Sequence, residues 1–571
     1  MREVKTRIPF SEIVKVGSPA YTFRMVVDEA KCSGCGQCAI ECPSRIIEMV
    51  KKETECQIAN CREACPASND VRYAMKLVRD GKGYESAFDY ITRVNPLPAS
   101  IGRTCPHPCE TDCSRGHLDK AVNLHGFERF IGDYAIEKGL KFAVPAAKLD
   151  KRVAVIGGGP AGLSAAYHLA KKGFAVTIYD MYEELGGMLR YGVPEYRAPR
   201  GVVEAEIARI VDLGVKVETG KKLGRDIAVD GLKAEYDAVY LALGRQKNME
   251  LGVTGQELAM SALDFLHAPA GKVGKNVLVI GGGSVAMDAA CSALRTGAEK
   301  VMVACLENRS EMPANAHDLR LALEEGVALV TKTGVEALEN TADGKVAVTL
   351  KECISVFDEN HCFAPSFGEI KADKFVADTV IAAIGQGADT DCVGDVAVNA
   401  RGLITLACEF SGKTNVAGVY AGGDVSQSKS MGSLAGAIVM GMNAADAIAE
   451  ELGYHAEAVK AAYPEVDEID QNQYNHYIDR NDGTEKDVAA RVGCLDCEVS
   501  CGFTEEMAAK EAERCLVCGT AVAKYVGPQD ARKFNMACNN CHNCVDACKE
   551  KAIHFEYTML TRNSNITFSD E

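Results

Sequence analysis

The stretch VAVIGGGPAGLSAAYHLAKKGFAVTIYD, residues 153–180, decides the fold of the centre of this chain. An apolar run enters a glycine-rich turn, a helical pattern follows, and a second apolar run ends just before Asp180. This order predicts strand, turn, helix and strand, a unit that binds a dinucleotide at its turn. Glycine lets the backbone approach a pyrophosphate closely, and an acid at the place of Asp180 can bind ribose hydroxyls. The loop residues of this candidate site are Gly157, Gly159, Pro160, Ala161 and Gly162.

A second unit of the same kind follows at residues 276–305, NVLVIGGGSVAMDAACSALRTGAEKVMVAC. Two such units predict two dinucleotide-binding domains. The second strand is followed by Leu306 and Glu307, where NADP-binding proteins carry arginines. A carboxylate repels a 2′-phosphate and accepts hydrogen bonds from a free ribose diol, so we expect NADH rather than NADPH; nearby Arg309 argues the other way. The loop residues of this second site are Gly281, Gly283, Ser284, Val285 and Ala286.

Most of the 25 cysteines lie in clusters near the two ends of the chain. The first cluster has the spacing C-x2-C-x2-C-x3-C-P, which wraps a [4Fe–4S] cluster in bacterial ferredoxins, and the last cluster is a near copy. These cysteines are Cys32, Cys35, Cys38 and Cys42, and Cys538, Cys541, Cys544 and Cys548. Two alternatives remain open: independent one-cluster modules, or one two-cluster module in which Cys548 serves the first triplet and Cys42 the second.

Iron–sulfur clusters move one electron at a time, whereas nicotinamide moves two as a hydride, so a chain with both needs a converter, usually a flavin. The formal net charge of −17 makes nucleic acid an improbable partner. The N-terminus MREVKTRIPF has no apolar signal core, and no run of about 18 apolar residues predicts a membrane span. We therefore expect a cytoplasmic protein whose clustered cysteines bind metal rather than form disulfides.

Two further segments carry a family resemblance: LGGMLRYGVPEYRAPR at 185–200 and VYAGGDV at 419–425. Together with the order of the glycine loops, they resemble the glutamate synthase small-subunit family, which includes the N-terminal part of dihydropyrimidine dehydrogenase. The resemblance implies FAD on the first loop and NAD(P) on the second. It implies Asp424 at the ribityl–phosphate region and a helix near Gly432 whose N-terminus faces the flavin ring. The cofactor-binding residues carried over are Gly187, Arg190, Gly423 and Asp424.

The same resemblance implies two [4Fe–4S] clusters in a helical region. One would use Cys56, Cys61 and Cys113, and the other Cys65, Cys105, Cys109 and Glu128. The chain departs from the family pattern at Glu53, where the first cysteine should stand. Either a carboxylate or another group completes that cluster, or the cluster has three irons or is absent.

Near the C-terminus, a fifth site is expected from Cys494, Cys497, Cys515 and Cys518, with a [4Fe–4S] cluster favoured over zinc. The total is then about five [4Fe–4S] clusters. Six scattered cysteines are expected to be small buried side chains: Cys291, Cys305, Cys353, Cys362, Cys392 and Cys408.

The expected fold class is α/β, with two Rossmann-like domains for FAD and NAD(P), a preceding α-helical iron–sulfur domain, and ferredoxin-like modules at both ends. The expected domains are 1–50 (ferredoxin-like), 51–145 (helical, iron–sulfur), 146–270 (FAD), 271–385 (NAD(P)), 386–455 (FAD, return) and 456–571 (C-terminal, iron–sulfur).

These features predict an oxidoreductase subunit that transfers electrons between NADH and a partner protein through FAD and the clusters, with no catalytic acid–base pair. The partner would be a ferredoxin or a catalytic reductase or dehydrogenase subunit in a hetero-oligomer. Two alternatives are a glutamate synthase small subunit that uses NADPH and a non-catalytic electron-relay scaffold.

Overall fold

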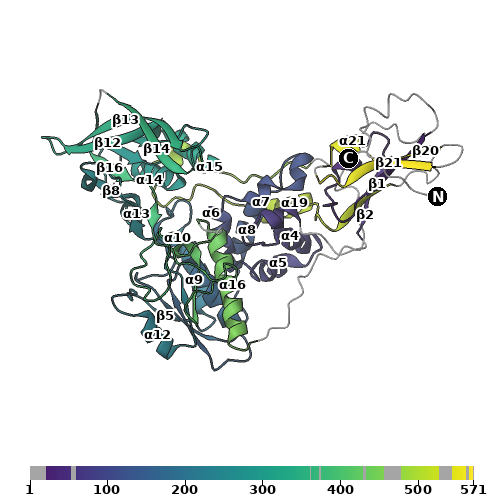
Figure 1. Cartoon of the computed structure of the whole chain (residues 1–571), viewed down its shortest axis with the longest axis horizontal. Coiled ribbons are helices and arrows are strands. Elements are labelled where there is room, and N and C mark those ends of the chain that lie inside the picture. Colours follow the sequence, from purple (N-terminus) through teal and green to yellow (C-terminus); the bar gives the residue numbers. More distant parts are fainter. Residues whose placement is uncertain are drawn as a thin grey trace.

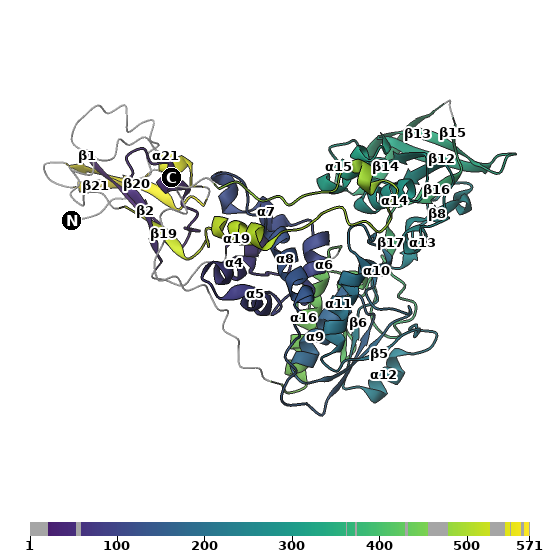
Figure 2. The same ribbon diagram turned by 180° about the vertical axis from the view of Figure 1, so that it is seen from behind.

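The computed structural model describes residues 21–52, 59–360, 362–371, 374–428, 432–454, 478–525, 543–548, 550–560 and 565–569. The molecule is elongated, with the two nucleotide domains at one end, a helical domain in the middle and a small ferredoxin-like module at the other end (Figures 1 and 2). Within the described residues, no helix is long and apolar enough to span a membrane.

The first nucleotide domain is a parallel sheet in the order β18-β6-β3-β4-β5. Its strands are β3 (Arg152–Ile156), β4 (Ala175–Tyr179), β5 (Lys216–Glu218), β6 (Ala238–Leu241) and β18 (Val419–Ala421). Helices α9 (Pro160–Lys171) and α16 (Leu434–Glu451) pack against each other beside it. The turn after β3 needs glycine, because Gly157 has φ of 107° and a Cβ there would clash with the carbonyl oxygen of Ala242.

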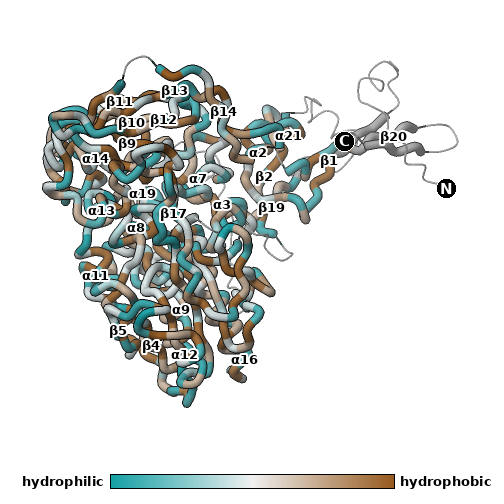
Figure 3. Tube along the Cα trace, turned by 60° about the vertical axis from the view of Figure 1, so that its left-hand side comes forward, coloured by the Kyte–Doolittle hydropathy of each residue, from teal (hydrophilic) through white to brown (hydrophobic). Residues whose placement is uncertain are grey.

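The second nucleotide domain has the parallel order β11-β10-β9-β16-β8. Its strands are β8 (Ala259–Ser261), β9 (Asn276–Ile280), β10 (Lys300–Ala304), β11 (Ala328–Val330) and β16 (Thr379–Ala382), and its helices are α13 (Ala262–His267), α14 (Ser284–Arg295) and α15 (Ala316–Glu324). Because β8 and α13 belong here, the predicted boundary at 270 lies too late in the chain. After their first residues, the central strands β3 and β9 are apolar and buried, as expected for parallel strands covered on both faces. Strand β9 lies beside β10 in Figure 3.

An antiparallel sheet packs on the second nucleotide domain, with β12 (Thr333–Asn340), β13 (Val346–Phe357), β14 (Phe363–Ile370) and β15 (Phe375–Ala377). The two domains are linked by the short antiparallel pair β7 (Lys247–Asn248) and β17 (Gln386–Gly387). Short elements complete these domains: α10 (Met188–Tyr191), α12 (Val229–Glu235), η2 (Gln256–Leu258) and η3 (Gly423–Val425).

The helical domain contains α3 (Asn60–Ala64), α4 (Val71–Arg79), α5 (Gly83–Ile91), α6 (Pro98–Thr104), α7 (Pro108–Thr111), η1 (Ser114–His117) and α8 (Leu124–Glu137). It shares one hydrophobic core with the first nucleotide domain. Helix α11 (Arg200–Val211) joins them, since buried Glu206 accepts the N–H groups of Ala99 and Ser100 at 2.7 and 2.9 Å. These N–H groups lie at the N-terminus of α6, where backbone donors lack helical partners.

The two ends of the chain form one module. Strand β1 (Tyr21–Val27) pairs with β20 (Ile553–Leu560), which pairs with β21 (Asn565–Ser569), and β2 (Ile47–Lys51) pairs with β19 (Ala521–Tyr525). Helices α2 (Gln37–Glu41) and α21 (Asn543–Asp546) contact each other. The two ends of the chain are therefore joined in one module, as in the second alternative, and do not form independent modules.

The predicted C-terminal domain at 456–571 is wrong as a separate unit. Helix α18 (Val488–Arg491) lies against the second nucleotide domain, because Arg491 pairs with Glu324 of α15 at 2.7 Å. Helix α19 (Glu505–Arg514) packs on α4 and α8 of the helical domain, and β19 belongs to the ferredoxin-like module. The sequence after residue 478 thus runs along three parts of the molecule in turn.

Candidate functional site

A cavity of about 610 Å³ lies at the carboxyl ends of β3, β6 and β18. This is the edge at which open parallel sheets bind their ligands. Eight predicted residues line it: Gly157, Gly159, Pro160, Ala161, Asp180, Gly187, Gly423 and Asp424. Val285, from the second glycine loop, lines the same cavity, so one space reaches both nucleotide loops.

Asp180 supports the first loop directly. Its Oδ2 accepts the N–H of Gly158 at 2.6 Å, and its Oδ1 accepts the N–H of Tyr182 at 2.8 Å. Burial raises the pKa of this carboxyl, although the same hydrogen bonds oppose the rise. Sequence reasoning missed Lys221 and Lys222, which also line the cavity and could face a pyrophosphate. No sequence signal distinguished them from other loop lysines.

Asp424 holds the start of α16 against the cavity. Its Oδ1 accepts the N–H of Gly432 at 2.8 Å, and its carbonyl oxygen accepts Nε of Arg245 at 3.0 Å. Ser433 caps the helix by accepting the N–H of Gly436 at 3.0 Å. The N-terminus of α16 lines the cavity through Gly432, Ser433 and Leu434, the arrangement that the family resemblance implied.

Two predicted residues, Gly162 and Arg190, do not line the cavity. A Cβ on Gly162 would clash with the carbonyl oxygen of Gly157, so this glycine lets helix and strand approach, as predicted. Arg190 does not line the cavity. Its guanidinium donates to the carbonyl of Leu185 at 2.9 Å and pairs with Glu184 and Glu204, because the chain turns back on itself there.

Glu307 faces the second glycine loop. Gly281 has φ of 137°, and a Cβ on Gly282 would lie 2.5 Å from Oε2 of Glu307. The carboxylate is therefore beside the turn on which the nucleotide is expected, whereas Arg309 is exposed. Gly283 and Ser284 begin α14, and Ala286 is buried within it.

The predicted second cluster site is assembled in the helical domain. One cavity is lined by Cys65, Cys105, Cys109 and Glu128. Burial raises the pKa of each thiol, to about 12 for Cys105, and the Glu128 carboxylate raises all three further. Oε1 of Glu128 accepts amides of Asn69 and Asn95 at 2.7 and 2.9 Å, and no described residue donates to Oε2. This donor set fits a cluster with three thiolates and one oxygen ligand.

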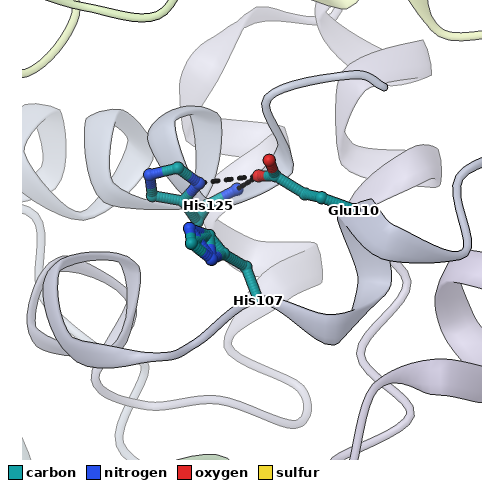
Figure 4. A group of neighbouring side chains, drawn as sticks. All are labelled: His107, Glu110 and His125. Atoms are coloured by element: carbon teal, nitrogen blue, oxygen red, sulfur yellow. Dashed lines mark hydrogen bonds and ion pairs between the residues drawn. The ribbon is translucent and has the colours of Figure 1, made fainter. Parts of the chain in front are cut away.

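His107, Glu110 and His125 lie beside this cavity (Figure 4). Oε1 of Glu110 accepts Nδ1 of His125 at 2.6 Å, and Oε2 accepts Arg480 at 2.8 Å. Burial alone raises the pKa of Glu110, but His125 and Arg480 outweigh it and lower the pKa to about 2. Burial and His125 lower the pKa of His107 to about 4. Glu110 is thus already paired with His125 and Arg480.

A third cavity is lined by Cys61, Cys113, Cys515 and Cys518. This corrects the predicted fifth site, because Cys515 and Cys518 are not grouped with the Cys494–Cys497 pair. Cys494 and Cys497 form a disulfide beside Asp496, and the carbonyl of Cys494 accepts Arg295 of α14. The intervening helix α19 carries the chain from one place to the other. Spacing along the sequence could not reveal this separation.

In the ferredoxin-like module, Cys32, Cys35 and Cys38 lie with Cys548. Burial raises the pKa of Cys35 and that of Cys38. The thiols of Cys32 and Cys548 raise both pKa values further. Cys42 and Cys544 are buried in the same small core. This agrees with the alternative in which Cys548 completes the first triplet. Cys56, Cys538, Cys541 and Glu53 lie outside the described residues.

Comparison with known proteins agrees with this geometry. Residues 151–445 match the model of the pyridine nucleotide-disulphide oxidoreductases. The chain belongs to this family. Residues 46–140 match dihydropyrimidine dehydrogenase domain II with its 4Fe-4S cluster, and residues 25–48 match a 4Fe-4S binding domain.

Three curated relatives span different shares of the chain. NADP(+)-dependent formate dehydrogenase subunit beta from Moorella thermoacetica is 36% identical over 64% of this chain, which spans only 56% of that protein. NADPH-Fe(3+) oxidoreductase subunit beta from Geobacter sulfurreducens is 32% identical over 83% of this chain and 77% of its own length. The glutamate synthase [NADPH] small chain of Azospirillum brasilense is 30% identical over 74% of this chain and 92% of its own length.

These matches confirm the resemblance and the cofactor classes expected from the sequence: FAD, a nicotinamide nucleotide and [4Fe–4S] clusters. They confirm the class of NAD(P)H-dependent oxidoreductase and leave the choice between NAD and NADP open.

Proposed function

We propose that this chain is the subunit of a larger complex that exchanges electrons between NADH and a protein partner. When bound, FAD supplies the conversion between a hydride and single electrons. The residues of this chain bind and orient the cofactors, so no acid–base pair is needed. The observation that carries the proposal is a row of three neighbouring cavities that leads to the cysteines of the ferredoxin-like module.

The row begins at α16. Leu434 and Ala437 line the flavin cavity, while Ala435 and Ile438 line the cavity of Cys65, Cys105, Cys109 and Glu128. Cys61 then lines both that cavity and the four-cysteine cavity beyond it. Finally, Cys35 of the ferredoxin-like module is close enough to affect the pKa of Cys518. Neighbouring sites thus share a helix, a residue or an electrostatic contact.

NADH is proposed as the nicotinamide substrate because Glu307 lies against the second glycine loop. Its negative charge would oppose a 2′-phosphate and accept bonds from a ribose diol. Several relatives carry NADP(+) or NADPH in their names, whereas the dihydropyrimidine dehydrogenase subunit PreT of Escherichia coli is named NAD-dependent. The side chain at position 307 is therefore the deciding feature for this chain.

The partner is proposed to be a ferredoxin or a catalytic oxidoreductase subunit that docks on the ferredoxin-like module. That module lies at the opposite end of the molecule from the two nucleotide domains (Figure 1). Relatives named as beta subunits support a hetero-oligomer.

A steady-state assay under anaerobic conditions tests the proposal. The cluster-loaded protein should reduce a one-electron viologen or a ferredoxin with NADH, and more slowly with NADPH. A strict preference for NADPH would favour the glutamate synthase alternative. Clusters that dithionite reduces, together with a flavin that neither nucleotide reduces, would favour the relay scaffold.

A further inference from the structure

Cys61, Cys113, Cys515 and Cys518 come from three distant parts of the chain. Cys61 lies in α3, Cys113 precedes η1, and Cys515 and Cys518 follow α19. All four are free thiols that line one cavity. Four cysteines from distant parts of the chain that line one cavity indicate a shared ligand.

The spacing of the sulfurs identifies the class of ligand. Zinc–sulfur bonds of about 2.3 Å hold tetrahedral thiolates about 3.8 Å apart. Within the described part of the chain, no three of these sulfurs lie within 4.8 Å of one another. A [4Fe–4S] cluster binds each thiolate through a different iron and so needs a wider set. The lack of such a close triplet among the described residues favours the cluster over a single zinc ion.

Buried arginines hold the C-terminal pair of cysteines in place. Arg72 donates to the carbonyl of Cys518, and Arg79 donates to that of Cys515 at 3.1 Å. Arg115 donates to the carbonyl of Arg514 at 2.8 Å. Arg72 and Arg115 are each only 1% exposed. Arg72 pairs with Asp70 at 2.7 Å and Arg115 with Asp119 at 2.8 Å, which fixes both guanidinium groups in position.

The turn between the two cysteines is itself constrained. Val517 has φ of 49°, in the left-handed region that β-branched residues rarely adopt. Such a conformation persists where the surroundings fix it, often at a ligand site. Here Gly519 is tied to the ferredoxin-like module, since its N–H donates to the carbonyl of Ser33 at 2.6 Å.

We propose that Cys61, Cys113, Cys515 and Cys518 bind one [4Fe–4S] cluster, in which the C-terminal pair takes the places that the family assigns to residues 53 and 56. This accounts for Glu53, because a thiolate is not required there. It also lowers the expected number of clusters from about five to about four, or about 16 iron atoms per chain. The cluster joins the helical domain to the ferredoxin-like module.

The test uses the full chain, purified anaerobically, as Cys515→Ser, Cys518→Ser and Cys56→Ser variants, with exposed Cys408→Ser as the matched control. Iron, sulfide, zinc and FAD are counted, and the dithionite-reduced EPR spectrum is recorded. Serine at 515 or 518 should remove up to about four irons, or change one EPR signal, at unchanged FAD content. Serine at 56 and at 408 should change neither.

Cys518→Asp distinguishes the loss of a ligand from misfolding, because an oxygen ligand can keep the cluster while shifting one midpoint potential. Retained iron with one shifted potential would support the proposal. Unchanged iron and spectra in both the Cys515 and Cys518 variants would overturn it. Loss of zinc instead of iron, or loss of the same EPR signal in Cys56→Ser, would also overturn it.

Discussion

At the scale of single residues, the proposed preference for NADH rests on the charge beside the second glycine loop. Glu307 stands 2.5 Å from where a Cβ on Gly282 would be, so little room separates its carboxylate from the loop. The residue type and its place after the second strand were readable from the sequence because strand, turn and helix follow a fixed order. The orientation of the side chain required the structure.

Glu307→Arg should invert the charge at this point. We expect the ratio of kcat/KM for NADPH to that for NADH to rise at least about tenfold, equivalent to about 1.4 kcal/mol. Steady-state viologen reduction with each nucleotide measures the ratio. Glu311→Arg, an exposed position on the same loop, is the control with the same charge change. An unmoved ratio in Glu307→Arg would remove the basis for NADH selection.

Glu128→Gln should change the cluster site of Cys65, Cys105 and Cys109. A neutral amide in place of a carboxylate lowers the negative charge at the site, so one midpoint potential should become more positive, or the cluster should be lost. Redox titration followed by EPR measures this. Glu137→Gln, whose side chain is 74% exposed on the same helix, should match the parent protein. If Glu128→Gln also matches the parent protein in every cluster potential and in iron content, Glu128 is not a ligand.

At the scale of elements, α16 lines both the nucleotide cavity and the cavity of Cys65, Cys105, Cys109 and Glu128. The helix approaches α9 so closely that a Cβ on Gly441 would clash with the carbonyl of Ala161, a residue of the first glycine loop. Such contact explains why small residues stand at this crossing. The sequence predicted both helices, but not which residue of α16 meets the loop.

Gly441→Ala should therefore push α16 away from α9. Overpacking of this kind costs roughly 1–3 kcal/mol, and the FAD content of the purified protein should fall. Gly231→Ala is the matched control, because Gly231 is helical and has open space at its Cβ position. Equal FAD content and thermal stability in the two variants would show that α16 is not closely held.

A second element contact, between α11 and α6, should depend on pH. Burial raises the pKa of Glu206 to about 7 from an ordinary value of 4.5, despite its bonds to Ser100 and Ala99. The folded state therefore binds this proton more tightly than the unfolded state, and the carboxyl makes the protein less stable as pH rises from about 4.5 to about 7. Thermal unfolding of wild type relative to Glu206→Gln should show this slope, and exposed Glu235→Gln should keep it. Parallel pH profiles for wild type and Glu206→Gln would contradict the assignment.

At the scale of the whole molecule, the last hundred residues join parts that the sequence presents as separate. Both nucleotide folds and the helical cluster site were predictable, because their motifs are local or carried by a family pattern. The grouping of Cys515 and Cys518 with Cys61 and Cys113 was not, because it depends on how α19 packs on α4 and α8. The pairing of β1 with β20 was left open by the sequence because the two strands lie at opposite ends of the chain.

The central claim is that the nucleotide cavity and the cysteine cavities form one electron path. The most direct test is to reduce the cluster-loaded chain fully, remove the reductant anaerobically, and add NAD⁺ in excess. A single FAD can return only two electrons, or one NADH, whereas connected clusters return more. The account predicts more than one NADH per FAD, together with the loss of cluster EPR signals. One NADH or less per FAD, with clusters that remain reduced until a viologen oxidant is added, would contradict it.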